Sequence, residues 1–235
     1  MRPVEELAPG LWSWTAPRGG IPETMTAYAL RDEEGTVLVD PLSGPLGREP
    51  DEALLAALDE IVRGRVRIVI TTPFHVRGSD LLWRRWRDRH DVTIYGHEQC
   101  VRPERLTDRS AFQPLRGGEE LEGGVRTHTI GKPKRAEMPI ELPSHRAIAF
   151  GDSVLEVDGG LRVWEDLDGD RRRAWYEQRF LPTLEALAAL DIERILVTHG
   201  EPVLQDGARA LRKALNREPW VRPPTIWSHP RRRPA

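Results

Sequence analysis

The chain has 235 residues, of which 39% are hydrophobic and 31% charged, so it can bury a core and is not intrinsically disordered. Its 35 Lys and Arg residues nearly balance its 37 Asp and Glu residues, which gives a formal net charge of -2. This excludes a global cationic field, and we therefore expect neither a nucleic acid nor a membrane as partner.

Cysteine usage and the N-terminal residues predict a cytoplasmic protein. The single cysteine, Cys100, has no partner for a disulfide or for a cysteine-based metal site. Residues 1–6 contain neither a long apolar run nor a cleavage pattern, and no stretch approaches the ~18 apolar residues of a membrane span. We therefore expect neither export nor membrane insertion.

The first part of the chain predicts an antiparallel meander followed by alternating helices and strands. Short apolar stretches separated by Gly and Pro are typical of strands and occupy residues 11–15, 26–30 and 36–39. Apolar residues at helical spacing then predict a helix that begins near Pro50 and ends at Gly64. A strand at 66–71, a helix at 79–89 and a strand at 92–95 come next, an order that is typical of a parallel βαβ crossover.

The second part predicts another meander followed by helices. Its short strands are joined by Gly, Pro and Asp turns and are expected at residues 119–121, 125–130, 140–142, 147–150 and 161–163. A helix at 171–190, a strand at 195–198 and a helix at 208–216 complete the pattern.

Two halves that each place strands before helices predict two sheets packed face to face with helices outside. The expected fold class is therefore α/β, a four-layer αββα sandwich formed by one domain at residues 1–217. Residues 218–235 are rich in Pro and Arg and predict an irregular tail, in which Trp220 and Trp227 could dock onto the body or another subunit.

Three residues combine an acid or an imidazole with the end of a predicted strand, where a sheet presents side chains to a ligand. They are His75, Asp152 and His199. We take them as the candidate catalytic residues.

The sequence resembles the metallo-β-lactamase superfamily over residues 11–215, in the order and spacing of its motifs. The matching features are the meander that ends at Asp40, the strand and loop at 66–79, the turn Phe150-Gly151-Asp152 and the segment Thr198-His199-Gly200. The resemblance implies a hydrolase fold built around a pair of metal ions.

The first metal-binding loop of that superfamily has the form Thr-His-x-His-x-Asp-His, and three of its four ligands are missing here. Aligned on Thr72 without gaps, the motif places Pro73, His75, Arg77 and Gly78 at the ligand positions. Only His75 can bind a metal.

Of the remaining family ligands, one is replaced and two are retained. Lys132 stands where a Thr-Pro-Gly-His turn supplies its His, whereas Asp152 matches the bridging carboxylate and His199 the last ligand. A catalytic zinc needs three protein ligands and an open position, and a pair of ions needs about six ligands. By resemblance, His75 would serve one ion, His199 the other, and Asp152 would bridge them.

The replacements put fixed positive charges where a divalent cation would bind. A buried carboxylate such as Asp152 is costly unless it is paired, and the side chains of Arg77 and Lys132 can offset that cost as a metal does. We therefore expect no metal at the centre and a small anionic molecule bound by Arg77 and Lys132. The alternative is that both side chains point to solvent. Asp40 is expected to support the metal loop by hydrogen bonding.

The other histidines, His90, His97, His128, His145 and His229, are assigned no ligand role. Ser79 stands where a helix begins and is expected to cap it.

Three functions stay open. The first is an inactive or non-classical hydrolase homologue that binds a small anion or a protein partner. The second is a hydrolase or oxygenase-like enzyme with one zinc, iron or manganese ion on His75, Asp152 and His199. The third is a metal-independent esterase or thioesterase with His75 as general base and Lys132 or Arg77 at the oxyanion. If the chain is an enzyme, the resemblance implies a hydrolase of esters, thioesters or lactones; the substrate and the oligomeric state are not predicted.

Overall fold

Strands β1 to β7 form one seven-stranded sheet in the order of the chain. The structure, a computed structural model, describes residues 2–17, 24–45, 49–101, 106, 108–131 and 136–221. Neighbouring strands from β1 to β4 are antiparallel, and those from β4 to β7 are parallel. The strands are β1 (Arg2–Ala8), β2 (Leu11–Pro17), β3 (Thr24–Arg31), β4 (Gly35–Val39), β5 (Arg65–Val69), β6 (Val92–His97) and β7 (Phe112–Leu115).

The second half of the chain builds a smaller sheet with the strand order β13-β10-β9-β8, and a separate hairpin of β11 and β12. In this sheet β10 pairs parallel with β13 and antiparallel with β9. The strands are β8 (Arg126–Thr127), β9 (Ile140–Leu142), β10 (Ala147–Phe150), β11 (Val154–Val157), β12 (Gly160–Val163) and β13 (Arg194–Val197).

Helices supply the connections that parallel strands require. α1 joins β4 to β5, α2 joins β5 to β6, and α3 and α4 lie between β12 and β13. No helix of the described residues is both long and apolar enough to cross a bilayer. The helices are α1 (Glu52–Ile61), α2 (Ser79–Trp86), α3 (Asp170–Trp175), α4 (Leu181–Ala188) and α5 (Gly207–Leu215), and the short 3-10 turns are η1 (Pro73–His75), η2 (Glu98–Cys100), η3 (Arg109–Ala111), η4 (Glu122–Gly124) and η6 (Pro143–His145).

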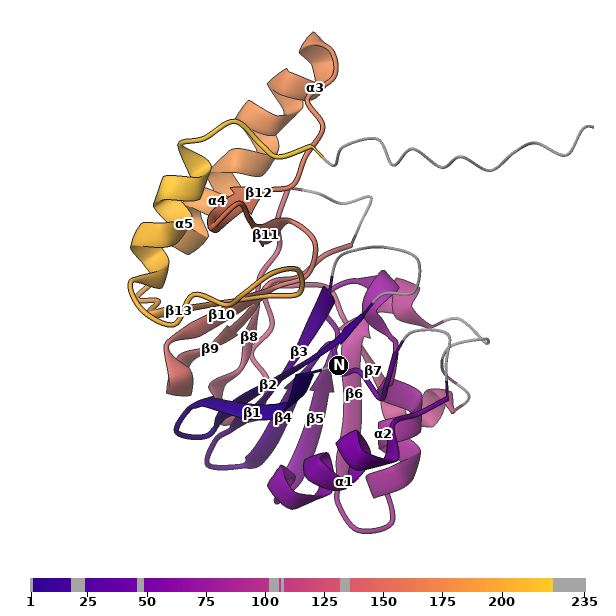
Figure 1. The fold of residues 1–235 in the computed structure, drawn as a ribbon. Helices are drawn as coiled ribbons and strands as arrows, with labels where there is room; N and C mark the ends of the chain where they lie inside the picture. The colour runs from indigo at the N-terminus through magenta and orange to yellow at the C-terminus, as the bar shows by residue number, and fades with distance from the viewer. Residues whose placement is uncertain are drawn as a thin grey trace, which may run out of the picture.

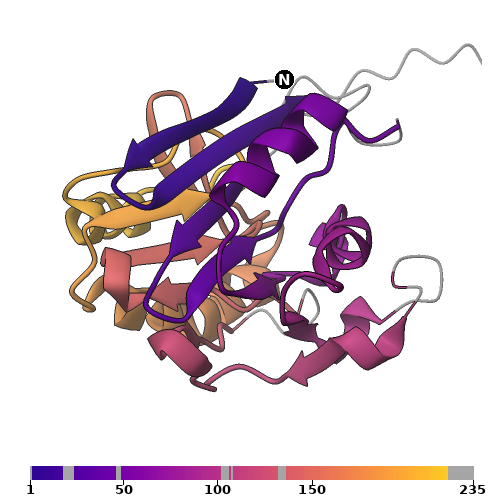
Figure 2. The same cartoon turned by 90° about the horizontal axis from the view of Figure 1, so that it is seen from below.

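The two sheets face each other, with α1 and α2 outside the first and α3 to α5 outside the second (Figure 1; Figure 2 shows the same layers from below). The hydroxyl of the buried Tyr28, on β3, donates to the carbonyl oxygen of Val197, on β13, at 2.7 Å, so a hydrogen bond joins the two sheets. The predicted four-layer αββα sandwich is confirmed.

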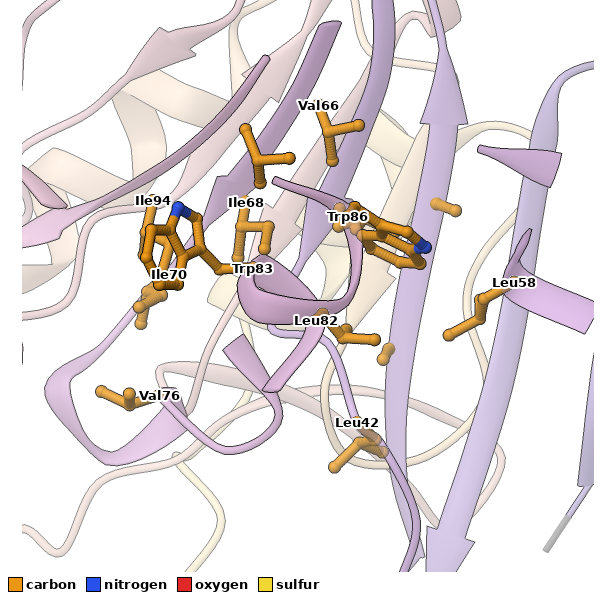
Figure 3. Close-up of a cluster of buried hydrophobic side chains, with 14 of the residues drawn as sticks. Leu42, Leu58, Val66, Ile68, Ile70, Val76, Leu82, Trp83, Trp86 and Ile94 are labelled. Atoms are coloured by element: carbon orange, nitrogen blue, oxygen red, sulfur yellow. The ribbon is translucent and has the colours of Figure 1, made fainter. Parts of the chain in front are cut away.

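Three apolar clusters fill the three spaces between the layers. The alternation of side chains along a strand explains how β5 serves two of them: Val66 and Ile68 face the helices, whereas Val69 faces the other sheet. Figure 3 shows the cluster between the first sheet and its helices, where Trp83 and Trp86 of α2 lie against Val66 and Ile68. The third cluster packs α4 and α5 against the second sheet.

Several elements differ from the prediction. β1, β7 and β11 were not predicted, because polar residues interrupt the apolar pattern of all three, and β1 and β7 also contain Pro. Residues 119–121 form only an isolated bridge, between Glu120 and Arg126. Trp220 docks onto the body of the same chain, whereas Trp227 lies outside the described residues.

The helix predicted at 171–190 is interrupted by the π-helical turn η7 (Tyr176–Phe180). Pro182, in the first turn of α4, has no N–H to donate to the preceding turn, and its ring crowds the carbonyl four residues back, so the helix widens there. Gly131 packs against this turn so closely that a Cβ at this position would lie 2.0 Å from the carbonyl oxygen of Arg179. Its N–H donates to Thr183 Oγ1 at 3.0 Å.

Asp59 links α1 to α2. Its carboxylate accepts hydrogen bonds from the indole N–H of Trp86 at 2.6 Å and from the guanidinium of Arg85 at 2.8 Å. The Arg85 hydrogen bonds are the main reason that the pKa of Asp59 lies below its usual value, with Trp86 adding to them against the opposing effect of burial.

We predict that Asp59→Ala lowers the free energy of unfolding by about 1–3 kcal/mol, because the fully buried Trp86 loses its acceptor. Asp59→Asn keeps an acceptor oxygen and should cost less. The depressed pKa means that the ionic contribution is complete above about pH 4 and is lost as the pH falls through the lower folded-state value. Urea unfolding at several pH values measures both effects. Asp88→Asn, at an exposed position, is the control, and an Asp59→Ala variant as stable as this control would contradict the assignment.

Candidate metal centre

Four polar side chains follow the carboxyl ends of four strands. Asp40 follows β4, His75 lies in η1 after β5, Asp152 follows β10 and His199 follows β13. Because β4 pairs parallel with β5, and β10 with β13, each pair of strand ends lies side by side within its sheet. Contacts between side chains join the two pairs into one centre.

The structure brings His75, Asp152 and His199 together. Asp152 Oδ1 lies 3.3 Å from His75 Nε2 and 3.3 Å from His199 Nε2. The two imidazole rings meet edge to face with their centroids 6.4 Å apart. All three side chains are buried, but between 4% and 7% of each residue stays exposed. Their predicted catalytic role stays a prediction.

Asp40 orients the His75 ring. His75 Nδ1 lies 2.8 Å from Asp40 Oδ2, and because a carboxylate only accepts, Nδ1 carries the proton and donates. Thr71 donates to Asp40 through its backbone N–H at 2.8 Å and through its hydroxyl at 2.5 Å. His75 Nε2 is therefore presented to Asp152.

The pKa values of His75, Asp40 and Asp152 depend on one another. Burial alone raises the pKa of Asp152, but His75 and His199 outweigh it and hold that pKa well below the usual value. Burial likewise raises the pKa of Asp40, and His75, Arg77 and Thr71 more than offset it. Burial and the charge of Arg77 lower the pKa of His75, yet Asp40 and Asp152 together raise it above the ordinary value.

Of the two cationic residues expected to bind an anion, Arg77 and Lys132, the structure describes only Arg77. Arg77 is half-buried, adopts a left-handed backbone with φ of 39°, and its charge acts on Asp40 and His75. Lys132 lies outside the described residues. The predicted role of both residues in anion binding stays a prediction.

A buried carboxylate that the sequence did not point to holds the turn around Asp152. Glu137 Oε1 accepts from the backbone N–H groups of Gly151 at 3.0 Å and Ser153 at 3.1 Å, and from the Ser153 hydroxyl. A Cβ at Gly151 would lie 2.6 Å from Thr71 Oγ1, so only glycine fits. Glu137 lies in no recognised motif, and a lone Glu two residues before Pro139 carries no signal for a buried role.

The remaining histidines make structural contacts. The ring nitrogens of His90 and His145 face backbone carbonyl oxygens at 3.0 Å and 2.7 Å, that of His97 accepts from the Gln99 N–H, and His128 contacts Glu141 at 2.8 Å. His229 lies outside the described residues. The expectation that Ser79 caps α2 is wrong, because Gly78 occupies the cap position and no side chain makes the capping hydrogen bond.

Solved structures resemble nearly the whole chain. A β-lactamase domain protein from Burkholderia ambifaria matches with a TM-score of 0.61 and 18% identity over 90% of this chain and 73% of its own. A metallo-β-lactamase from Pontibacter korlensis gives a TM-score of 0.61 and 15% identity over 92% of this chain and 99% of its own. The chain has the metallo-β-lactamase fold.

The same fold is shared with proteins of other activity. Rubredoxin oxygen:oxidoreductase from Desulfovibrio gigas matches with a TM-score of 0.62 and 17% identity over 90% of this chain and 59% of its own. No protein-family model and no curated protein matches the chain.

The donor set could hold one metal ion, because two of its three ligand-to-ligand separations match a tetrahedral site. At metal–ligand distances of about 2.0–2.1 Å, neighbouring ligands of a tetrahedral ion lie about 3.3–3.4 Å apart, and Asp152 Oδ1 lies 3.3 Å from each His Nε2. The three ligand atoms lie within 4.8 Å of one another. Within the described part of the chain this is the one such group of His, Cys, Asp or Glu side chains.

We predict that Glu137→Ala lowers the free energy of unfolding by about 2–5 kcal/mol, because two buried backbone donors around Asp152 lose their acceptor. Glu137→Gln keeps an amide oxygen at the same position and should cost less than half as much. Denaturant unfolding monitored by circular dichroism compares the two variants. Equal stability of Glu137→Ala and the wild type would contradict the assigned role.

Proposed function

We propose that the protein is a hydrolase of the metallo-β-lactamase fold that works with one divalent metal ion held by His75, Asp152 and His199. The observation that carries this proposal is the pair of 3.3 Å separations between Asp152 Oδ1 and the two His Nε2 atoms. Three protein ligands and one open position are the usual equipment of a catalytic zinc site. The sequence alone favoured a metal-free centre, and the geometry shifts the preference to this mononuclear alternative.

The residues of the chain prepare the site in two ways. Asp40 fixes the tautomer of His75, so the unprotonated Nε2 faces the metal position, as carboxylates do behind many metal-ligating histidines. Burial of the three ligands provides the low-dielectric surroundings in which electrostatic interactions with a substrate are strong. A divalent ion held by these residues would supply Lewis acidity and lower the pKa of a coordinated water.

Charge narrows the class of substrate that we propose. Arg77 places a fixed positive charge beside the His75–Asp40 pair, where it can attract a carboxylate or the oxyanion that develops during acyl transfer. We therefore propose a small ester, thioester or lactone that carries a negative charge.

A second candidate is a metal-free protein that binds a small anion. It is favoured by the charge balance of the centre: Asp40 and Asp152 carry two negative charges, and a protonated His75 with Arg77 carries two positive charges. The charges of these four side chains thus balance without any ion. Metal content separates the two candidates.

We predict about one metal ion per chain by elemental analysis of protein expressed with added zinc, iron and manganese. His199→Ala should remove it, because two ligands do not make a stable site. His128→Ala is the matched control, since His128 also contacts a carboxylate, that of Glu141, but lies outside the centre.

Two ions per chain would contradict the mononuclear proposal, and none after reconstitution would favour the anion-binding candidate. Iron as the retained metal would favour an oxygenase-like enzyme over a hydrolase, because two histidines and one carboxylate are also a set that binds Fe(II).

We further predict that Asp40→Asn lowers the metal affinity by about 10–100-fold while the protein stays folded. Asn tolerates the left-handed backbone of this position, where φ is 47°, but its neutral amide no longer favours the His75 tautomer that ligates. Competition with a chromophoric chelator measures the affinity, and circular dichroism checks the fold. An affinity equal to that of the wild type would contradict the role of Asp40.

A further inference from the structure

His199 lacks the anchor that His75 has. His75 Nδ1 is held by Asp40 at 2.8 Å, whereas His199 Nδ1 is buried and makes no hydrogen bond with any residue that the structure describes. A histidine that binds a metal usually has its second ring nitrogen fixed by an outer partner. Other contacts must therefore orient the His199 ring.

Trp164 supplies one of these contacts. Its indole meets the His199 ring edge to face, with the centroids 6.0 Å apart and the planes at 84°. The backbone of Trp164 is fixed in turn, because its N–H donates to the carbonyl oxygen of Ser153 at 3.0 Å, next to Asp152. The N–H of Glu156, on β11, donates to the carbonyl oxygen of His199 at 2.9 Å. The β11–β12 hairpin and the residue after it thus hold both the backbone and the ring of His199.

The segment after α5 completes this arrangement. Trp220 lies alongside the end of β12, donating to Val163 at 2.7 Å and accepting from Glu165 at 3.2 Å through its backbone. Its ring meets that of Trp164 edge to face at 5.9 Å. Just before it, the carbonyl oxygen of Glu218 accepts from Arg162 at 2.6 Å. The chain beyond the last helix is therefore attached to the residue that contacts His199.

We propose that Trp164 and Trp220 are positioning residues for His199, so that residues 218–221 belong to the metal centre. Trp164 fixes the imidazole plane by aromatic contact in place of the missing hydrogen bond, and Trp220 holds Trp164 in place. This inference deepens the proposed function and rests on it for the ligand role of His199. The arrangement of the rings does not depend on any ion, and it can be measured without one.

The first measurement uses metal-free protein labelled at histidine. The ring current of Trp164 displaces the NMR signals of the His199 ring, which are assigned by their absence in His199→Gln. Trp164→Leu should abolish the displacement, and Trp220→Ala should reduce it and broaden the signals. Trp220→Phe should restore it, because an aromatic ring again supports Trp164. Trp175→Ala is the matched control: Trp175 stacks on Phe180 with centroids 5.5 Å apart and has no contact with His199 among those that the structure gives.

The second measurement titrates the same variants with Co²⁺ alone and follows its visible absorption. Trp220→Ala should weaken Co²⁺ binding by up to about tenfold, the lower end of what loss of an outer partner causes. Trp220→Phe and Trp175→Ala should bind as the wild type does.

The outcomes separate the two proposals. Unchanged His199 signals and unchanged Co²⁺ affinity in Trp220→Ala would overturn the positioning role and leave the proposed function standing. A wild-type protein that binds no Co²⁺ would overturn the proposed function, and the NMR comparison would still decide the positioning role. If Trp220→Ala fails to fold, Trp220→Phe decides, since a folded Phe variant without the displaced His199 signals also overturns the inference.

Discussion

The carboxylate of Asp40 is the contact on which the centre depends. It accepts hydrogen bonds from the backbone N–H and hydroxyl of Thr71 and from His75, which both follow β5 of the first sheet. It also accepts from the hydroxyl of Thr198, at 3.3 Å, and Thr198 follows β13 of the second sheet. One buried group thus fixes the tautomer of a candidate ligand and joins the ends of strands from both sheets. Burial works against its charge, and these donors keep it ionised. The left-handed backbone that turns Asp40 into this position is one that Asp tolerates better than most residues do.

The same geometry suits a proton or a metal ion. His75 stands between Asp40 and Asp152, which favour its protonated form, yet a histidine must be unprotonated to ligate. Occupation of the centre is therefore a competition between an ion and a proton for the space beside Asp152. Arg77 acts against both competitors, because its fixed charge disfavours any additional positive charge near His75, whether proton or metal ion.

Much of the fold could be predicted from hydrophobic periodicity, since the buried strands and amphipathic helices carry strong patterns, and the candidate centre was predicted from strand ends and the resemblance. The elements and residues that were not predicted share a physical cause, which is that partners far away in the sequence determine their structure and contacts. β1 alternates poorly because it is an edge strand, with exposed Glu side chains. Glu137 and Trp164 gain their roles only when the turn at Gly151 and the segment after β13 are brought to them. The interruption at η7 could have been anticipated from Pro182, which cannot continue a regular helix.

That interruption limits which residues can stand at position 131. The widened turn at η7 accommodates the backbone of Gly131, and any larger residue at this position would collide with the Arg179 carbonyl. The shape of the helix and the residue at position 131 therefore depend on each other, although Gly131 and Arg179 are 48 positions apart in the sequence. A side chain at position 131 therefore requires the helix on the outside of the molecule to be rebuilt.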